Sequence, residues 1–370
     1  MLRVHSERHT AFLEKWTTEV HNPAANGMRR HLEPLPAAHC GNLLFSGRVA
    51  PQCRTMPCDS VTLSHERGAM RKSAIRTLTA AARTPIIAAA HFERTVQIWD
   101  LEKGRRLSEF DTVFDYGGNR LALDPAGGVC VAASWKKGKR GGVAAYDAQS
   151  GRVLWHRHDR GSPGLRFSAS GTAIWYRVGC HGPVWQLDAR TGETLTVMRN
   201  VEDVFDSPFA SYKVEARRDA FLLKSVTEFR LSRLTFAVLD ATFSPDAFCV
   251  SESGGPVRCI NCASGDERWR YVPPSGSHVL KLFYSETDGC FYGVEWPYEH
   301  GGPVVLIRRI SQEAGSSTEV CRLDSFPFDW CFHADVVVSA PGDVASLKEG
   351  TISKRLAFPQ RDYPERPTSE

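Results

Sequence analysis

The sequence has no motif of a familiar catalytic centre and no segment long enough to cross a membrane. It contains no Gly-x-Ser-x-Gly elbow, no phosphate-binding P-loop and no His-Glu-x-x-His zinc motif. No apolar run approaches the roughly 20 residues that a membrane span requires. Residues 1–16 carry His, Arg and Glu without an apolar stretch, so we expect no secretory signal. These absences argue against the corresponding enzymes and against a membrane protein.

Paired cysteines and a strong net charge are also lacking. The 11 cysteines are an odd number scattered through strand-like segments, which is typical of reduced thiols in a cytoplasmic protein and not of a disulfide framework. Cys259 and Cys262 form a lone Cys-x-x-Cys across a predicted strand, where residues three apart point to opposite faces, so we expect no zinc site. The formal net charge of +4 is too small to indicate nucleic-acid binding.

What the chain does contain is a repeated β-hairpin. Residues 96–107 alternate as a half-buried strand does, reach Trp99, turn at Gly104 and begin a second strand. Gly104 suits the turn because glycine adopts positive φ without steric cost. Similar hairpins follow at residues 142–155, 183–195 and 256–269.

The spacing of these hairpins predicts a propeller. Their turn glycines, Gly104, Gly151, Gly192 and Gly265, follow one another at 47, 41 and 73 residues, so the last interval leaves room for a degenerate copy. Repeats of about 40–50 residues with about four strands each are typical of propeller blades, which stack to bury both faces of each sheet. We therefore predict an all-β protein with, most simply, seven four-stranded blades; six or eight stay open.

Two groups of proteins resemble these repeats. Residues 95–104 resemble the end of a WD repeat, and residues 145–155 resemble the repeats of the pyrroloquinoline-quinone-like propellers. The resemblance covers roughly residues 73–359 and implies an architecture but no function, because propellers include both scaffolds and enzymes. The adjacent Cys-Cys pair of the quinone-dependent propeller dehydrogenases is missing, so we expect neither quinone nor another cofactor.

The chain divides into three predicted parts. Residues 1–69, rich in Pro, His and Arg without a sustained period, are expected to be a poorly ordered, irregular extension, which translation from Met70 would omit. Residues 70–358 are expected to be the propeller and residues 359–370 a disordered tail. The last blade is completed either by an N-terminal strand or by four strands of its own. The predicted blades span roughly residues 73–110, 111–158, 159–199, 200–234, 235–273, 276–323 and 326–358.

The recurring tryptophans of the hairpins are predicted to be core residues. A single four-stranded blade cannot cover both of its faces, so large side chains must fill the gaps between neighbouring sheets. We assign this role, in preference to ligand stacking, to Trp99, Trp155, Trp185 and Trp269.

A partner-binding surface is predicted on one face. The resemblance implies that the loops between the second and third strands, with the connections between blades, form the face on which propellers bind partners; we call it the loop-rich face. Three of these loops carry aromatic side chains beside basic ones, as binding hot spots do, although residues 136–140 can also be read as a solvated hairpin loop. The predicted contact residues are Trp135, Lys136, Lys137, Arg140, Trp175, His181, Trp296, Tyr298 and His300.

A recurring Phe-Asp pair suggests a second kind of site. Asp115, Asp206 and Asp329 follow one another at 91 and 123 residues, about two and three blades, and so share one predicted repeat phase. Carboxylates that converge on the central channel would suit a divalent cation, which prefers several oxygen ligands. The alternative, which we favour, is that each Asp accepts backbone N–H groups in its own turn.

The function predicted from these patterns is that of a cytoplasmic, monomeric, non-catalytic scaffold. It would bind a protein or peptide partner on the loop-rich face and would not associate with membranes. The rival is a lactonase-like hydrolase whose divalent metal is held by Asp115, Asp206 and Asp329. A nucleic-acid adaptor is suggested by residues 136–140 alone and is the least supported.

Overall fold

The computed structural model describes most of the chain between residues 75 and 358. The predicted extension, residues 1–69, and the predicted tail, residues 359–370, lie outside the described residues. The described ranges are 75–91, 94–114, 120–134, 141–159, 164–177, 182–225, 227–235, 238–274, 277–297, 304–324 and 329–358.

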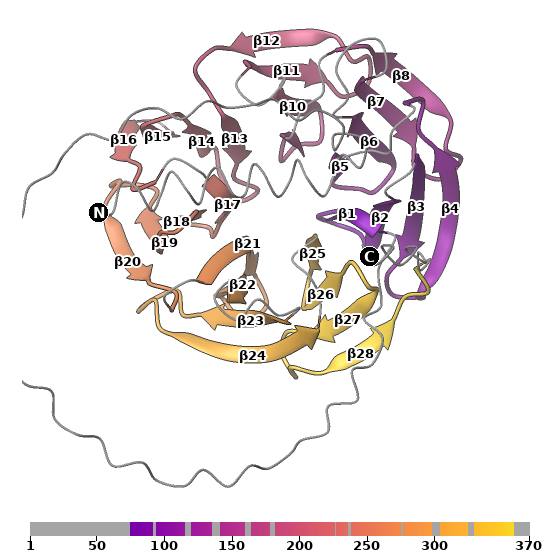
Figure 1. The fold of residues 1–370 in the computed structure, drawn as a ribbon. Coiled ribbons are helices and arrows are strands. Elements are labelled where there is room, and N and C mark those ends of the chain that lie inside the picture. The colour runs from indigo at the N-terminus through magenta and orange to yellow at the C-terminus, as the bar shows by residue number, and fades with distance from the viewer. Residues whose placement is uncertain are drawn as a thin grey trace, which may run out of the picture. The chain divides into compact units, whose positions relative to one another are not determined.

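These residues form seven four-stranded antiparallel sheets, arranged as the blades of a propeller (Figure 1). Each sheet consists of four strands that follow one another in the chain, with the first strand innermost. Blades 1 to 3 contain β1 (Ile75–Ala80), β2 (Ile86–His91), β3 (Thr95–Asp100), β4 (Arg105–Asp111), β5 (Arg120–Leu123), β6 (Val129–Ser134), β7 (Gly142–Asp147), β8 (Val153–Arg157), β9 (Leu165–Phe167), β10 (Ala173–Arg177), β11 (Val184–Asp188) and β12 (Thr194–Met198). Blades 4 and 5 contain β13 (Asp203–Asp206), β14 (Lys213–Ala216), β15 (Ala220–Lys224), β16 (Glu228–Ser232), β17 (Val238–Phe243), β18 (Ala247–Glu252), β19 (Val257–Asn261) and β20 (Glu267–Tyr271). Blades 6 and 7 contain β21 (Ser277–Ser285), β22 (Cys290–Pro297), β23 (Val304–Ile310), β24 (Ser317–Asp324), β25 (Trp330–His333), β26 (Val336–Ser339), β27 (Asp343–Ser346) and β28 (Ile352–Arg355).

The predicted fold class and the predicted count of seven blades are confirmed. The poorly marked fourth copy is a complete sheet, β13 to β16. The question of how the last blade is completed is also answered, because blade 7 consists of β25 to β28 and takes no strand from the N-terminal side.

Strand sequences follow from the position of each strand in its blade. Second strands such as β2 are covered on both faces by neighbouring blades, so they read as apolar runs with small side chains: Ala88, Ala89 and Ala90 are fully buried. Fourth strands lie at the outer edge and are charged and mostly exposed, as in β4. Charged edges hinder unwanted pairing with other chains.

Neighbouring blades are joined by a recurring contact, which we call the outer clamp. In six of the seven blades, the pairing of the third and fourth strands contains a register shift, as between Ala145 and Tyr146. In four of these six blades, the side chain just after the bulge reaches the turn between the third and fourth strands of the next blade. It donates a hydrogen bond to the carbonyl that lies three residues before the turn glycine. The donor and acceptor pairs are Ser108 to Ala148, Trp155 to Ala189, Trp269 to Gln312 and Lys354 to Leu101.

The turn glycine of the outer clamp lets the two blades approach closely. Gly192 has φ of +73°, and a Cβ built on it would lie 2.6 Å from the ring of Trp155. Gly315 has the same relation to Trp269, with 2.9 Å to its ring. Glycine therefore has two roles here, since it supplies the left-handed turn and leaves space for the indole.

The recurring tryptophans contribute to packing, as predicted. Trp99 and Trp269 are buried, and Trp155 packs against the core shared by blades 2 and 3. Trp185 packs against the same core and is half-buried, with the Arg157 guanidinium 4.8 Å from its ring centre.

The junction between blades 3 and 4 has no outer-clamp hydrogen bond among the described residues, and neither do the junctions of blades 4 and 5 and of blades 6 and 7. Thr196 takes the position that Trp155 and Trp269 occupy in their blades, and among the described residues it has no outer-clamp contact with blade 4. The β15–β16 pairing has no register shift, and its turn at residues 225–227 contains no glycine. Leu195 and Val197 of β12 are 55% and 48% exposed. The fourth repeat is poorly marked in the sequence because it lacks the turn that would form an outer clamp with blade 3.

Blade 7 closes the ring through side chains. The Lys354 ammonium donates to the Leu101 carbonyl, which completes the outer clamp between blades 7 and 1. At the inner side, the Leu78 N–H donates to Asp329 Oδ2 at 3.0 Å. Apolar residues of both blades, including Trp99 and Phe358, form one buried cluster between these contacts.

We expect Gly192→Ala to destabilise the protein more than Gly104→Ala. Both glycines have positive φ, +73° and +61°, so alanine carries a similar backbone cost of roughly 1–2 kcal/mol at either position. Only at Gly192 would the added Cβ meet an indole ring, while nothing lies within 4 Å of the Cβ at Gly104. Overpacking should add about 1–3 kcal/mol to the loss of unfolding free energy in Gly192→Ala, measured by urea denaturation. Equal losses in the two variants would contradict the clamp.

Candidate functional site

The inner strands place a ring of polar side chains where the central channel meets the loop-rich face. Each inner strand ends in a turn on the opposite face, so residues at equal distance before this turn lie at the same level. Asp203, Asp240 and Asp329 share one level, four residues before the turn residues Ser207, Ser244 and His333. The same level holds Thr77, Arg120 and Lys281 in other blades.

Two of these carboxylates join adjacent blades. Asp240 Oδ2 accepts the Leu282 N–H of blade 6 at 3.0 Å, just as Asp329 accepts Leu78 of blade 1. Asp329 Oδ1 also accepts its neighbour's N–H, from Trp330, at 3.0 Å. Both side chains are buried, so the hydrogen bonds compensate the loss of solvation of these groups. The two aspartates are therefore structural links between inner strands.

Cations balance the charge of the ring. Arg166 lies 3.3 Å from both Asp203 and Asp240, and its guanidinium is 4.4 Å from the centre of the Phe205 ring. Burial, the largest influence, lowers the pKa of Arg166, but the two carboxylates outweigh it and hold this pKa above its usual value. Lys281 Nζ lies 3.8 Å from Asp329. Asp203, Asp240 and Asp329 of the ring are thus compensated by Arg166 and Lys281.

The predicted carboxylate site is not brought together among its described members. Asp206 is the last residue of β13, whereas Asp329 directly precedes β25, so they lie at opposite ends of their inner strands. The Phe-Asp spacing therefore does not correspond to one structural position, because the pair falls at the end of the inner strand in blade 4 and at its start in blade 7. Asp115 lies outside the described residues. Within those residues, no three His, Cys, Asp or Glu side chains gather in a way that could hold a metal.

Asp206 has a different partner. The Trp175 indole N–H donates to Asp206 Oδ2 at 2.7 Å, across the junction of blades 3 and 4. Burial raises the pKa of Asp206, and the Trp175 hydrogen bond and the Lys213 charge oppose this only in part. Lys213 Nζ also lies 5.6 Å from the centre of the Trp175 ring. This set of contacts secures a junction that lacks the outer clamp.

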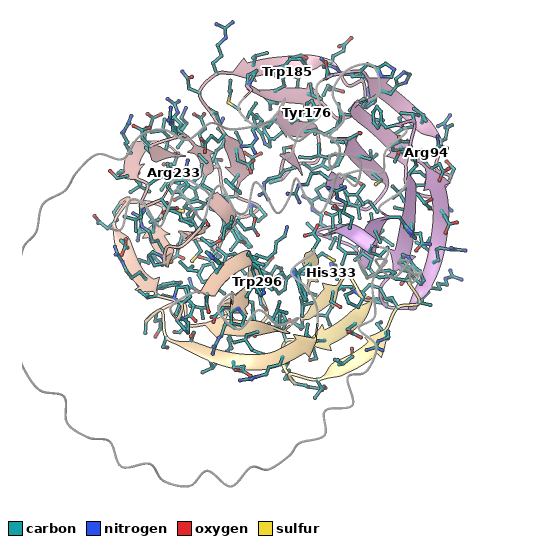
Figure 2. All side chains as sticks on the ribbon, viewed as in Figure 1. Arg94, Tyr176, Trp185, Arg233, Trp296 and His333 are labelled. Carbon is teal, nitrogen blue, oxygen red and sulfur yellow. The ribbon has the colours of Figure 1, made fainter. Side chains whose placement is uncertain are left out.

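Only two of the predicted partner-contact residues fall within the described structure. Trp175 is buried in a small apolar cluster with Val184, Val201 and Val204, so its ring does not face a partner. Trp296 lies near the end of β22 and is half-buried, packed against the core that blades 6 and 7 share (Figure 2). Trp135, Lys136, Lys137, Arg140, His181, Tyr298 and His300 lie outside the described residues.

Three buried glutamates on second strands were missed by the sequence reasoning. Glu252 Oε2 accepts the N–H groups of Leu234 at 2.9 Å and Thr235 at 2.8 Å, which fixes the connection into blade 5. The other two, Glu215 and Glu295, pair with basic side chains of their own blades. A single polar residue inside an apolar strand is the only sequence signal for such groups.

The described cysteines have no features of reactive or metal-binding thiols. All seven are free, and Cys130, Cys249, Cys259, Cys262 and Cys331 are buried. Burial raises the pKa of Cys130 to about 12 and that of Cys262 also to about 12. These thiols stay protonated at neutral pH and are poor nucleophiles.

Comparison with known proteins supports the architecture. A family model described as outer membrane protein assembly factor BamB matches residues 117–201, which covers β5 to β12. No curated protein matches the chain. No helix that could span a membrane occurs among the residues that the structure describes. With the seven sheets, the match makes this chain a β-propeller that resembles the quinoprotein-like repeat proteins.

We expect the stability of Asp206→Asn relative to wild type to rise with pH. Because the pKa of Asp206 is raised on folding, its stabilising contribution is complete below the unfolded-chain pKa and is lost as pH rises through the folded-chain pKa. Asn does not titrate, so the unfolding free energy of the variant minus that of wild type should increase between about pH 4 and about pH 7, measured by urea denaturation.

Glu215→Gln is a control of opposite sign. Burial raises the pKa of Glu215, but its ion pairs with Lys224 and Arg217 outweigh burial and hold the pKa below its usual value. The contribution of Glu215 is present above the unfolded-chain pKa of 4.5 and is lost as pH falls through the lowered folded-chain pKa, so the difference for Glu215→Gln should decrease as pH rises toward about 5 and then level off. Parallel trends in the two variants would contradict these assignments.

Proposed function

We propose that this chain is a non-catalytic propeller scaffold that binds a protein or peptide partner on its loop-rich face. The observation that carries the proposal is that the described charged groups of the channel mouth are used within the fold. Asp240 and Asp329 bind backbone N–H groups of adjacent blades, and Arg166 and Lys281 neutralise their charge. A general base, a nucleophile or a metal-binding carboxylate would need a free, suitably placed group instead.

The comparison with known families agrees with a binding role. The matching model is described as an assembly factor, and those words denote a role in assembly rather than a reaction. The free thiols of the described residues support the related proposal that the chain acts in a reducing compartment such as the cytoplasm. The lactonase-like alternative is less well supported, since Asp206 and Asp329 occupy opposite ends of their strands.

The proposed partner surface includes the segment between β6 and β7. It contains Lys136, Lys137 and Arg140 and connects a second strand to a third strand, so we expect it on the loop-rich face. The turns between third and fourth strands lie on the opposite face and carry exposed basic residues of their own, Arg152, Arg190 and Lys348. Each set contains three basic residues, so replacing either set by glutamate changes the net charge by the same amount on one face or the other.

We expect Lys136→Glu/Lys137→Glu/Arg140→Glu to lose a partner that Arg152→Glu/Arg190→Glu/Lys348→Glu retains. Charge reversal at a binding surface disrupts complementarity, whereas the same reversal on the opposite face leaves the surface intact. The measurement is quantitative affinity purification from the native cell extract, followed by titration of the purified partner with each variant. Equal affinity of both triple variants for every recovered protein would refute this choice of face.

A further inference from the structure

Three arginines gather beside blade 4, at its loop-rich end. Arg177 ends β10, Arg217 follows β14 and Arg233 follows β16. Arg233 is labelled in Figure 2. Glu202 connects them, because Arg177 Nη1 donates to its carbonyl at 3.0 Å and Arg233 Nη1 donates to its Oε2 at 2.6 Å. Arg233 Nη1 also donates to the Arg217 carbonyl at 2.6 Å. We call these three residues the arginine cluster.

Much of the hydrogen-bonding capacity of the arginine cluster is unused. The Arg233 side chain is only 1% exposed, and its Nε and Nη2 are buried without a partner. The Nε atoms of Arg177 and Arg217 are likewise buried without a partner. Buried N–H groups of a charged side chain are costly when unpaired, so each such group in a native structure requires an explanation.

The unused atoms of Arg233 have the geometry of a recognition site. Nε and Nη2 lie on the same edge of the guanidinium and can donate two parallel hydrogen bonds to one carboxylate or phosphate group. The opposite end of the group is held by Glu202 and the Arg217 carbonyl, and its carbon lies 5.8 Å from the centre of the Phe221 ring. Arg233 is thus fixed in place, with one bidentate edge buried and without a hydrogen-bond partner.

The surroundings carry excess positive charge. Lys213 and Lys224 lie 3.9 and 2.8 Å from Glu215, whose other oxygen accepts from Arg217 at 3.0 Å. Glu228 lies 3.6 Å from Lys224. The five cations of this region therefore face four carboxylates, Glu202, Glu215, Glu228 and the Asp206 that Lys213 also influences, and an added anion would improve the balance of charge.

We propose that the arginine cluster binds an oxyanion, namely a carboxylate in an acidic segment of the protein partner. Arg217, whose side chain is 35% exposed, and the half-buried Arg177 would form the outer part of the site, with Arg233 behind them. A nucleic acid is a poorer match, because the whole chain has a formal net charge of only +4. The choice of a protein ligand rests on the proposed function; the oxyanion chemistry does not.

Titration of the full chain tests this inference. The probes are a blocked oligoglutamate peptide, a matched oligoglutamine peptide and inorganic phosphate, followed by isothermal titration calorimetry. We expect oligoglutamate to bind and oligoglutamine not to bind. Arg177→Gln and Arg217→Gln, which leave the buried Arg233 in place, should each weaken oligoglutamate binding by about tenfold or more. Arg230→Gln is the matched control, since Arg230 lies on the same blade, is 62% exposed and pairs with Asp219 instead.

Three outcomes would overturn the proposal. The first is absence of oligoglutamate binding by the wild-type chain, and the second is equal binding by all three variants. The third is binding of phosphate without oligoglutamate, which would make this a small-anion site and not a partner site. These titrations need no native partner, so they can fail while the purification from cell extract succeeds, and the reverse also holds.

Discussion

The hydrogen bond from a fourth-strand side chain to the turn of the next blade is the contact on which four junctions of the propeller depend, those of blades 1 and 2, 2 and 3, 5 and 6, and 7 and 1. A four-stranded sheet cannot bury both of its faces alone, so every blade needs a neighbour held at a fixed distance. The indoles of Trp155 and Trp269 set this distance by donating to Ala189 and Gln312 while lying on the turn glycines. Lys354 forms the equivalent bond to Leu101, so the same geometry that repeats within the chain also joins its two ends.

This constraint explains which parts of the fold could be predicted from the sequence. A local turn with its glycine and a following large side chain leaves a visible pattern, and it marked the hairpins of blades 1, 2, 3 and 5. Blade 4 was poorly marked because the β15–β16 turn has neither the bulge nor the glycine. The closure is not evident from the sequence because it rests on side-chain contacts between the two ends of the propeller, from Lys354 to Leu101, from Leu78 to Asp329 and within a shared apolar cluster.

The candidate site was much harder to predict. Asp240 and Asp329 accept backbone N–H groups of the next blade. This role depends on how far each aspartate lies from the turn that follows it, and no local sequence motif marks that distance. The Phe-Asp pairs repeat in sequence but fall at different levels of the inner strands, so their spacing grouped Asp206 with Asp329. Trp175 resembles a loop aromatic at the end of a strand, yet its indole bonds to Asp206 inside the protein. The roles of these residues depend on contacts between different blades, and the sequence of one repeat does not reveal such contacts.

The charges of the described structure divide into two groups, and this division underlies the functional proposal. The acids and bases of the channel mouth are paired with one another or with backbone amides, which favours stability over chemistry. The arginine cluster of Arg177, Arg217 and Arg233 instead keeps donors without acceptors beside the junction of blades 3 and 4. That junction lacks the outer clamp. The proposed binding residues therefore lie at a junction where no outer-clamp contact constrains the choice of side chains.

Hydrogen–deuterium exchange of the full chain tests the role of the clamp most directly, because amide exchange reports the free energy of local opening. The account predicts that β12, a fourth strand without an outer-clamp hydrogen bond, exchanges faster than β8 and β20, which carry Trp155 and Trp269. It also predicts that β1 and β28, at the closure of the ring, are protected as well as the strands of interior blades. Fastest exchange at β1 and β28, with β12 no faster than β8 and β20, would contradict it.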